Sequence, residues 1–253
     1  MSNPMRPAAT LILLRDRVDE VPELLMLERA AGMAFAAGAL VFPGGRVDEH
    51  DFALAARLGA GRTEEPDDLA ARIAAIRETI EETGVAVGVD PLPDPAAIES
   101  LRDALHAGRP FAELIDRFGL SIDFDALSNF ARWQPPVTAP KRFDTRFYVA
   151  AAPQDAKEIA DGSESVRALW STAHDLIRES DDGRVRMMWP TLANLARIGQ
   201  FRNFAETRED AIQHGHHLTI GWSEIREGLR HLCIPDDIGY PISSMPVNKM
   251  HSG

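Results

Sequence analysis

Three glutamates in the run Arg77–Val85 (Arg-Glu-Thr-Ile-Glu-Glu-Thr-Gly-Val) have the spacing needed to act on one ligand. Glu78, Glu81 and Glu82 occupy positions i, i+3 and i+4, so a helix would place their carboxylates on one face. Like charges at these spacings cost about 0.2–0.5 kcal/mol per pair unless a cation lies among them. Carboxylate oxygens are the ligands that magnesium prefers. Taken alone, the run fits either a divalent-metal site or a solvated acidic helix face.

The helix that would carry these acids has clear start and end signals. Pro66 is followed by two aspartates, which the helix dipole favours in a first turn, and Gly84 is suited to the position after the last turn. Apolar residues recur at spacings of four, three and four, which is typical of one buried helix stripe. They are Leu69, Ile73, Ile76 and Ile80. We therefore expect one helix from Pro66 to Gly84, with its acids opposite its apolar stripe.

The rest of the chain alternates between strand and helix patterns, which predicts a mixed α/β fold. Apolar alternation and turn residues predict strands at 8–14, 24–29, 39–42, 85–89, 144–151 and 166–170. Helices are expected at 51–58, over most of 95–133, and at 191–198 and 224–232. No repeat or low-complexity linker divides the chain, so residues 1–253 are interpreted as one continuous domain with insertions.

Composition excludes several classes of function. The formal net charge of −12 is unsuited to a nucleic-acid or anionic-membrane surface, both of which need basic patches. A single cysteine excludes an internal disulfide and a cysteine-rich zinc site. The apolar run Leu11–Leu14 is too short to cross a bilayer and is followed at once by charged residues. We therefore expect a cytoplasmic protein.

The motifs together resemble the Nudix hydrolase superfamily. Arg77–Val85 matches every position of the second half of the Nudix box, and Pro43-Gly44-Gly45 stands where the box begins. The segments that flank the box are similar to the coenzyme A diphosphatase branch. They are Leu25–Arg29, Phe42–Gly45, Arg142–Tyr148 and Trp189–Thr191. The resemblance implies a Nudix α/β/α sandwich with a mixed sheet, a helical insertion at about 92–133 and a helical C-terminal extension at about 190–232.

The box departs from the usual pattern at two places. The interval between Gly45 and Arg77 is 18 residues longer than usual, an insertion at about 46–63 that the coenzyme A diphosphatase branch also carries. The first box glutamate, which supports the arginine, is absent; Asp51 or Asp68 could replace it, or the support is missing. The coenzyme A motif is also imperfect, with Phe35 and alanines where an arginine is expected.

The resemblance implies a divalent-metal site. Glu78, Glu81 and Glu82 would be carboxylate ligands of magnesium or manganese, and Gly45 would offer its carbonyl oxygen. Arg77 would pair with a helix carboxylate and fix its direction. The general base would be Glu82 or an acid on a later loop, for which Glu164 is the candidate.

Three arginines, Arg29, Arg46 and Arg142, are candidates for binding the substrate phosphates, because arginine binds phosphate oxygens through two parallel hydrogen bonds. An ordinary surface role is the alternative for each. The reaction expected is hydrolysis of the phosphoanhydride bond of a nucleoside-diphosphate derivative, with coenzyme A or acyl-coenzyme A as the first choice. The alternatives are ADP-ribose, NADH or a nucleotide sugar, a catalytically inactive ligand sensor, and a plain interaction domain. Homodimers are common in this family, but the sequence locates no interface.

Overall fold

The computed structural model describes residues 4–33, 36–136, 142–160, 162, 164–215 and 217–247, so Phe35 lies outside the described residues. Its strands are β1 (Arg6–Arg17), β2 (Glu20–Arg29), β3 (Leu40–Val41), β4 (Gly44–Arg46), β5 (Val89–Asp90), β6 (Ser121–Ile122), β7 (Ser128–Gln134), β8 (Phe143–Ala151), β9 (Ser165–Thr172), β10 (Leu218–Ile220), β11 (Trp222–Arg226), β12 (Leu229–Cys233) and β13 (Ser244–Pro246). Its helices are α1 (Glu49–Leu58), α2 (Pro66–Thr83), α3 (Pro95–His106), α4 (Phe111–Phe118), α5 (Ala173–Asp181), α6 (Trp189–Ile198) and α7 (Phe204–His214), and a short 3-10 helix covers Phe124–Ala126.

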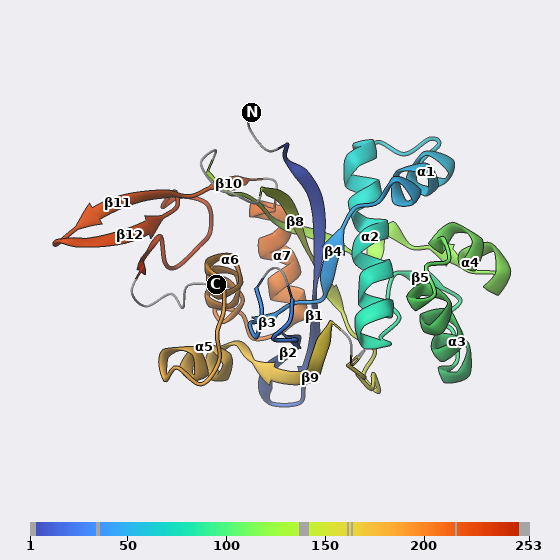
Figure 1. Cartoon of the computed structure of the whole chain (residues 1–253), viewed down its shortest axis with the longest axis horizontal. Coiled ribbons are helices and arrows are strands. Elements are labelled where there is room, and N and C mark those ends of the chain that lie inside the picture. Colours follow the sequence, from blue (N-terminus) through green and yellow to red (C-terminus); the bar gives the residue numbers. More distant parts are fainter. Residues whose placement is uncertain are drawn as a thin grey trace.

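A mixed eight-stranded sheet forms the centre of the molecule (Figure 1). Its main path runs β10-β7-β8-β1-β2-β3, with β1 parallel to β8 and antiparallel to β2. The sheet divides beside β1, because β4 pairs with its first half and β2 with its second half. This division leaves room next to β4, which is the segment that carries the two glycines of the box.

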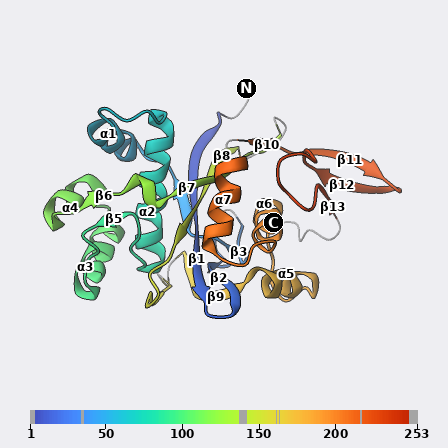
Figure 2. The same ribbon diagram turned by 180° about the vertical axis from the view of Figure 1, so that it is seen from behind.

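Helices cover both faces of this sheet, as seen from the two opposite sides in Figures 1 and 2. α1 to α4 lie on one side, and α5, α6 and α7 lie on the other. β1 explains how the sheet supports two cores, because its side chains alternate between the faces. Leu11 and Leu13 belong to the α2 side, whereas Ile12 and Leu14 pack on the side of α6, and all four are almost fully buried. The predicted mixed sheet between helices is confirmed.

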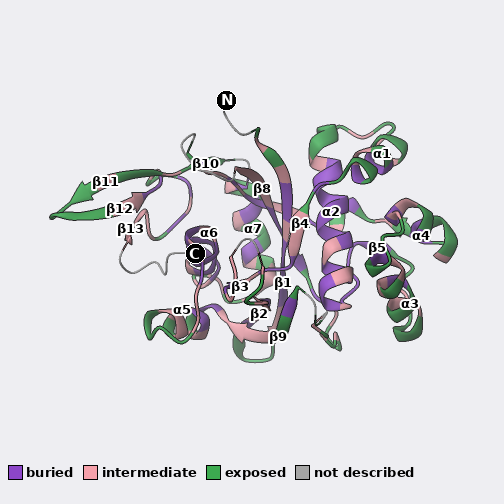
Figure 3. Cartoon of the chain, in the orientation of Figure 1, coloured by how far each residue is buried: buried purple, intermediate pink, exposed green. Residues whose placement is uncertain are grey.

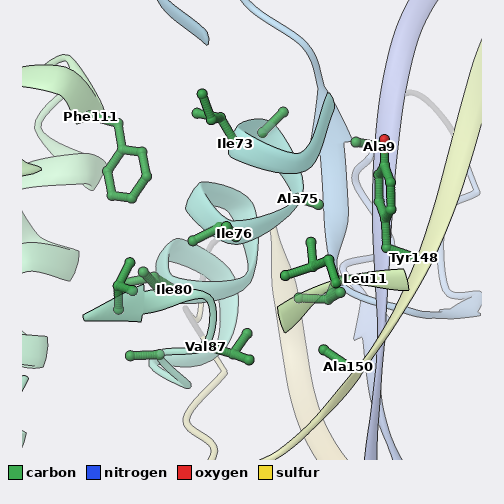
Figure 4. Close-up of a cluster of buried hydrophobic side chains, with 14 of the residues drawn as sticks. Ala9, Leu11, Ile73, Ala75, Ile76, Ile80, Val87, Phe111, Tyr148 and Ala150 are labelled. Carbon is green, nitrogen blue, oxygen red and sulfur yellow. The ribbon is translucent and has the colours of Figure 1, made fainter. Parts of the chain in front are cut away.

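α2 is buried along most of its length, unlike an ordinary surface helix (Figure 3). Ala75 faces β1, and the isoleucines Ile73, Ile76 and Ile80 lie on the side toward Phe111 of α4 (Figure 4). The small side chain of Ala75 lets the helix backbone come close to the sheet. The start and end signals are confirmed, with Pro66 at the first turn and a left-handed Gly84 after the last.

The helix predicted at 224–232 is wrong, and with it the end of the predicted helical extension at 190–232. This segment is an antiparallel hairpin of β11 and β12, and only α6 and α7 form the helical part of that extension. Ile225, Leu229 and Leu232 have helical spacing by coincidence. Glu227 and Gly228 both have positive φ, 50° and 79°, which is the geometry of a two-residue hairpin turn.

The insertion at 92–133 is helical only in its first part. α3 and α4 confirm the predicted helices, but the chain turns into β7 at Ser128, where the helical prediction is wrong. β7 lies beside β8, and the main-chain pairing of the sheet outweighs the local pattern there. In the predicted strand 85–89, only Val89 belongs to a strand, β5. The other predicted strands and the helices at 51–58 and 191–198 are confirmed, with ends that differ by a few residues. Within the described part of the chain, no helix is long and apolar enough to span a membrane.

Candidate active site

The box glycines lie on β4, between β1 of the sheet and helix α2. β4 pairs with β1, with Gly45 opposite Ala9 and Gly44 opposite Thr10. Gly44 has φ +152°, and a Cβ there would lie 2.3 Å from the carbonyl oxygen of Ala9. A Cβ on Gly45 would lie 2.3 Å from Oε1 of Glu78. Gly44 therefore has no room for a side chain beside β1, and Gly45 has room for one only if the carboxylate of Glu78 moves.

Arg77 is held by a buried aspartate from the inserted helix α1. Its Nε and Nη2 donate to the two carboxylate oxygens of Asp51 at 3.1 and 2.9 Å, and Asp51 is only 1% exposed. Arg77 also donates to the carbonyl of Arg46 at 3.0 Å and to Glu78 at 2.9 Å. Burial alone would lower the pKa of Arg77, but the hydrogen bonds to Asp51 and the charge of Glu78 raise it above its ordinary value. Arg77 therefore stays charged, and its hydrogen bond holds the carboxylate of Glu78 in one orientation.

Of the two acids that could replace the missing box glutamate, the structure brings only one to Arg77. Asp68 lies nine residues before Arg77 on the same helix, where it accepts from Arg72 at 2.8 Å and from the hydroxyl of Tyr148 at 2.9 Å. Asp51 is the partner because α1 folds back over α2. The insertion in the box thus supplies, through Asp51, the carboxylate that supports Arg77 in place of the missing first box glutamate.

Glu82 is a buried carboxylate close to the box turn, and Glu78 beside it is partly buried, with its side chain 17% exposed. Glu82 accepts a hydrogen bond from the backbone N–H of Gly44 at 2.9 Å and is 5% exposed. Burial raises the pKa of Glu78 to about 7, despite the opposing charge of Arg77. Burial, followed by the charge of Glu78, raises the pKa of Glu82 well above its ordinary value. The raised pKa values show that the negative charges of Glu78 and Glu82 are not fully compensated by the groups around them.

These acids fit a divalent cation in donor chemistry, although the side chains do not form a complete ligand set. Among the residues that the structure describes, no group of three or more His, Cys, Asp or Glu side chains is arranged around one point. Glu78 and Glu82 offer hard oxygen donors with uncompensated charge, and Gly45 packs directly against Glu78. Glu81 is more exposed and lies 3.6 Å from Nη1 of Arg77. A cation would balance the charges that burial makes unfavourable.

A cleft of about 510 Å³ opens beside this turn. Glu78 reaches it from α2, and the N-terminal end of α6 closes another side. The polar part of its lining consists of Thr10, Arg29, Arg46, Asp48, Glu78, Thr145, Glu164 and Thr191. The apolar part contains Ala8, Ala36, Val41, Phe42, Phe143, Phe147, Met188 and Pro190, with Gly44 and Gly45 between the two. The cleft therefore offers cations and carboxylates beside an extended apolar wall.

The structure brings most of the predicted site residues to this cleft. Arg29 and Arg46 line it together with Glu164, and an Nη atom of Arg29 lies 3.6 Å from Glu164. The charges of Arg29 and Glu164 both act on Glu82, which places the predicted base near the box acids. Arg142 precedes Phe143, a lining residue, but is not itself part of the lining. Arg29 and Arg46 are thus the better placed candidates for phosphate contacts.

The apolar wall was not predicted. Phe143, Thr145 and Phe147 line the cleft because they are alternate residues on one face of β8. The alternation in 144–151 identifies such a face, but it does not say what the face borders. Met188 and Pro190 come from the start of α6, which the sequence places only as a helix beginning.

Replacement of Gly45 by alanine is expected to lower turnover about 10–100-fold with the fold retained, as for loss of a partner that orients a metal ligand. The new methyl group would displace the carboxylate of Glu78, the flexible end of a side chain. Steady-state kinetics and circular dichroism measure the two effects. Gly32→Ala is the matched control, because its Cβ would meet no heavy atom within 4 Å. Equal activity of both variants would contradict a role for the Gly45–Glu78 contact.

Glu78→Gln is expected to stabilise the metal-free protein at pH 8 but not at pH 4.5. The pKa of Glu78 is raised from 4.5 to about 7 in the folded state, so the folded chain binds more protons between these values. The free energy of unfolding therefore falls as pH rises from about 4.5 to about 7, and then stays level. Glutamine does not titrate, so the free energy of unfolding of the variant is expected to be about 1–3 kcal/mol higher than that of the wild type at pH 8. Thermal unfolding in EDTA measures it, with the exposed Glu99→Gln as control. A difference independent of pH would refute the argument.

Comparisons with known proteins agree with this geometry. A crystal structure of a NUDIX hydrolase from Alicyclobacillus acidocaldarius superposes with a TM-score of 0.72 and 29% identity, covering 83% of this chain and 97% of the other. The acyl-coenzyme A diphosphatase NUDT19 of Gallus gallus is 27% identical over 233 residues, covering 71% of this chain and 61% of the relative. The Homo sapiens protein of the same name is 25% identical over 268 residues, covering 85% and 72%. The matched region thus spans only about three fifths of the chicken relative.

The fold, the box turn and the acids of α2 define this chain as a member of the Nudix hydrolase superfamily, which confirms the predicted fold class. The family model of the NUDT19 Nudix domain matches residues 54–198. The chain belongs to the NUDT19 Nudix domain family.

Proposed function

We propose that this protein hydrolyses the phosphoanhydride bond of a nucleoside-diphosphate derivative with the help of a divalent metal ion, and that its substrate is coenzyme A or an acyl-coenzyme A. One observation carries the proposal. A single cleft combines the box residues Glu78 and Gly45 with two arginines, Arg29 and Arg46, and with an apolar wall. This arrangement suits a ligand with a charged diphosphate and an apolar arm.

The metal would be held by Glu78, Glu81 and Glu82 and by the carbonyl oxygen of Gly45. Magnesium or manganese, when bound, supplies positive charge for the phosphate oxygens and lowers the pKa of a water molecule. Arg77 would keep Glu78 in place, because its own position is determined by Asp51.

Arg29 and Arg46 would bind the phosphate oxygens from the cleft side. Arg29 is suited to this task because its side chain is only 15% exposed and its ion pair with Glu164 is long, at 3.6 Å. Glu164, 57% exposed at the mouth of the cleft, would accept the proton of the attacking water, with Glu82 as the alternative base. A new P–O bond forms as the anhydride P–O bond breaks, and the products are two phosphate monoesters.

The apolar wall favours coenzyme A derivatives over more polar dinucleotides. Phe42, Phe143, Phe147 and Met188 would pack against the pantetheine arm or an acyl chain. The names of the chicken and human relatives, acyl-coenzyme A diphosphatase, support the same choice. ADP-ribose, NADH and nucleotide sugars are the alternatives, since they carry the same diphosphate without an apolar arm.

The test is a substrate panel with magnesium or manganese, with products separated by chromatography. Coenzyme A and acyl-coenzyme A are expected to give 3′,5′-ADP and a 4′-phosphopantetheine product. They are expected to react faster than ADP-ribose, NADH and the nucleotide sugars in the panel. Preference for ADP-ribose or NADH would retain the hydrolase and overturn the substrate. No turnover with any substrate, accompanied by ligand binding in calorimetry, would favour the inactive sensor.

A further inference from the structure

The C-terminal hairpin of β11 and β12 projects from the body of the protein (Figures 1 and 2). It lies outside residues 54–198, which match the family model, and plays no part in the cleft. Its surface is unusually apolar for so exposed a segment: Ile225 is 67% exposed, Leu229 47% and Trp222 41%. Figure 3 shows β11 exposed along most of its length. Side chains alternate along a strand, so Ile225 lies on one face of the hairpin and Trp222 and Leu229 on the other. Exposed large apolar side chains on a projecting element are typical of an interaction surface.

β11 also has an open edge. The three-stranded sheet has the order β11-β12-β13, so β11 is an end strand within the described part of the chain. Arg226 and Leu229 flank the two-residue turn and form a hydrogen-bonded pair in a hairpin of this type. Hydrogen-bonding direction alternates along a strand, so Ser223 and Ile225 direct their N–H and C=O groups away from β12. An unprotected edge of this kind is a template for another strand.

The sequence of β11 is complementary to itself in one antiparallel register. When two copies pair about Ile225, the two Ile225 residues lie opposite each other and exchange both backbone hydrogen bonds. Glu224 of each copy then lies opposite Arg226 of the other. Cross-strand pairs of opposite charge and of apolar residues both stabilise a sheet. Within one chain Glu224 and Arg226 already form an ion pair, so the four charges would make one network on one face of the joined sheet.

We propose that β11 is a dimerisation strand, which joins two copies of this chain through antiparallel pairing centred on Ile225. The two three-stranded sheets would then form one continuous six-stranded sheet across a twofold axis. The partner is a second copy because one register satisfies three conditions at once. In it the outward-facing backbone groups of the two strands pair, the two Ile225 side chains meet, and Glu224 of each copy lies opposite Arg226 of the other. A strand of another protein would have to reproduce that pattern.

The test is sedimentation velocity of the full chain over a range of concentrations, so its readout does not depend on activity. The wild type is expected to dimerise reversibly. Ile225→Lys is expected to weaken the dimer by about tenfold or more, because it places two like charges opposite each other at the centre. Val18→Lys is the matched control, since Val18 is 90% exposed in the turn between β1 and β2. A wild type that stays monomeric, or a dimer unaffected by Ile225→Lys, would overturn the proposal.

A charge exchange identifies the register. Glu224→Arg and Arg226→Glu each place like charges opposite each other in a homodimer, so each variant alone is expected to be monomeric. An equimolar mixture of the two is expected to form heterodimers, because the two arginines of one variant then lie opposite the two glutamates of the other. The single-chain ion pair is lost in both variants, so only pairing between chains explains a rescue. Two variants that each remain dimeric, or a mixture that stays monomeric, would overturn this register.

Discussion

Glu82→Gln is expected to reduce kcat by about 10³-fold, which corresponds to the several kcal/mol that a correctly held metal ion contributes to a transition state. The fold should survive, because the amide oxygen of glutamine can still accept the N–H of Gly44, now 2.9 Å from Glu82. The uncharged side chain removes a buried negative charge that burial and the charge of Glu78 make unfavourable, against the smaller opposing effect of Arg29. Steady-state kinetics with manganese or magnesium measures the loss, and calorimetry measures metal affinity.

The control for this variant is Glu99→Gln, which removes the same charge from the exposed side of α3. It is expected to leave kcat and metal affinity unchanged. Glu78→Gln and Glu81→Gln extend the comparison to the other two acids of the proposed metal site. Full activity of Glu82→Gln would remove that residue from the proposed metal site and from the choice of general base.

Asp51→Asn is expected to destabilise the protein by about 2–4 kcal/mol, because it leaves the buried guanidinium of Arg77 without its main counter-charge. The side chain keeps its shape, so the loss reflects charge and not a cavity. Glu78 also contacts Arg77, which limits the effect. Turnover should fall about 10–100-fold as well, since Arg77 would no longer be fixed beside Glu78. Chemical denaturation and kinetics measure the two losses.

Asp48→Asn is the matched control for this change. Asp48 is the N-cap of α1 and lies 3.8 Å from an Nη atom of Arg77, but its side chain is 53% exposed. Asparagine is as good an N-cap as aspartate, so stability should change by no more than about 0.5 kcal/mol. Asp51→Glu keeps the charge and should recover part of the loss. Equal effects at positions 48 and 51 would show that Asp51 has no special relation to Arg77.

The local elements of this protein were predictable from sequence because their signals are local. The helix from Pro66 to Gly84 has a proline and acids at its start, a periodic apolar stripe and a glycine at its end. The spacing of Glu78, Glu81 and Glu82 puts the acids on one side of that helix whatever packs around it. The resemblance to the Nudix box added the glycine turn and the expectation that the acids bind metal.

Local patterns misled where sheet pairing decides the structure. The spacing of Ile225 and Leu229 imitates a helix, but a turn with two positive φ angles closes a hairpin there. The segment of β7 likewise continues a helical pattern, although its pairing with β8 makes it part of the central sheet. In both places the deciding hydrogen bonds join segments that a local window does not compare.

Short-range sequence patterns are sufficient for helix α2, its acids and the glycine turn, since each depends on residues a few positions apart. The acid that supports Arg77 follows only from the folded chain, because Asp51 lies 26 residues away and is brought there by the packing of α1 on α2. The cleft also exists only in the folded chain, since its arginines, glutamates and apolar wall come from β2, the box, β8, the residue before β9 and α6. A site assembled from such distant segments depends on how sheet and helices pack, and single-sequence patterns do not contain that information.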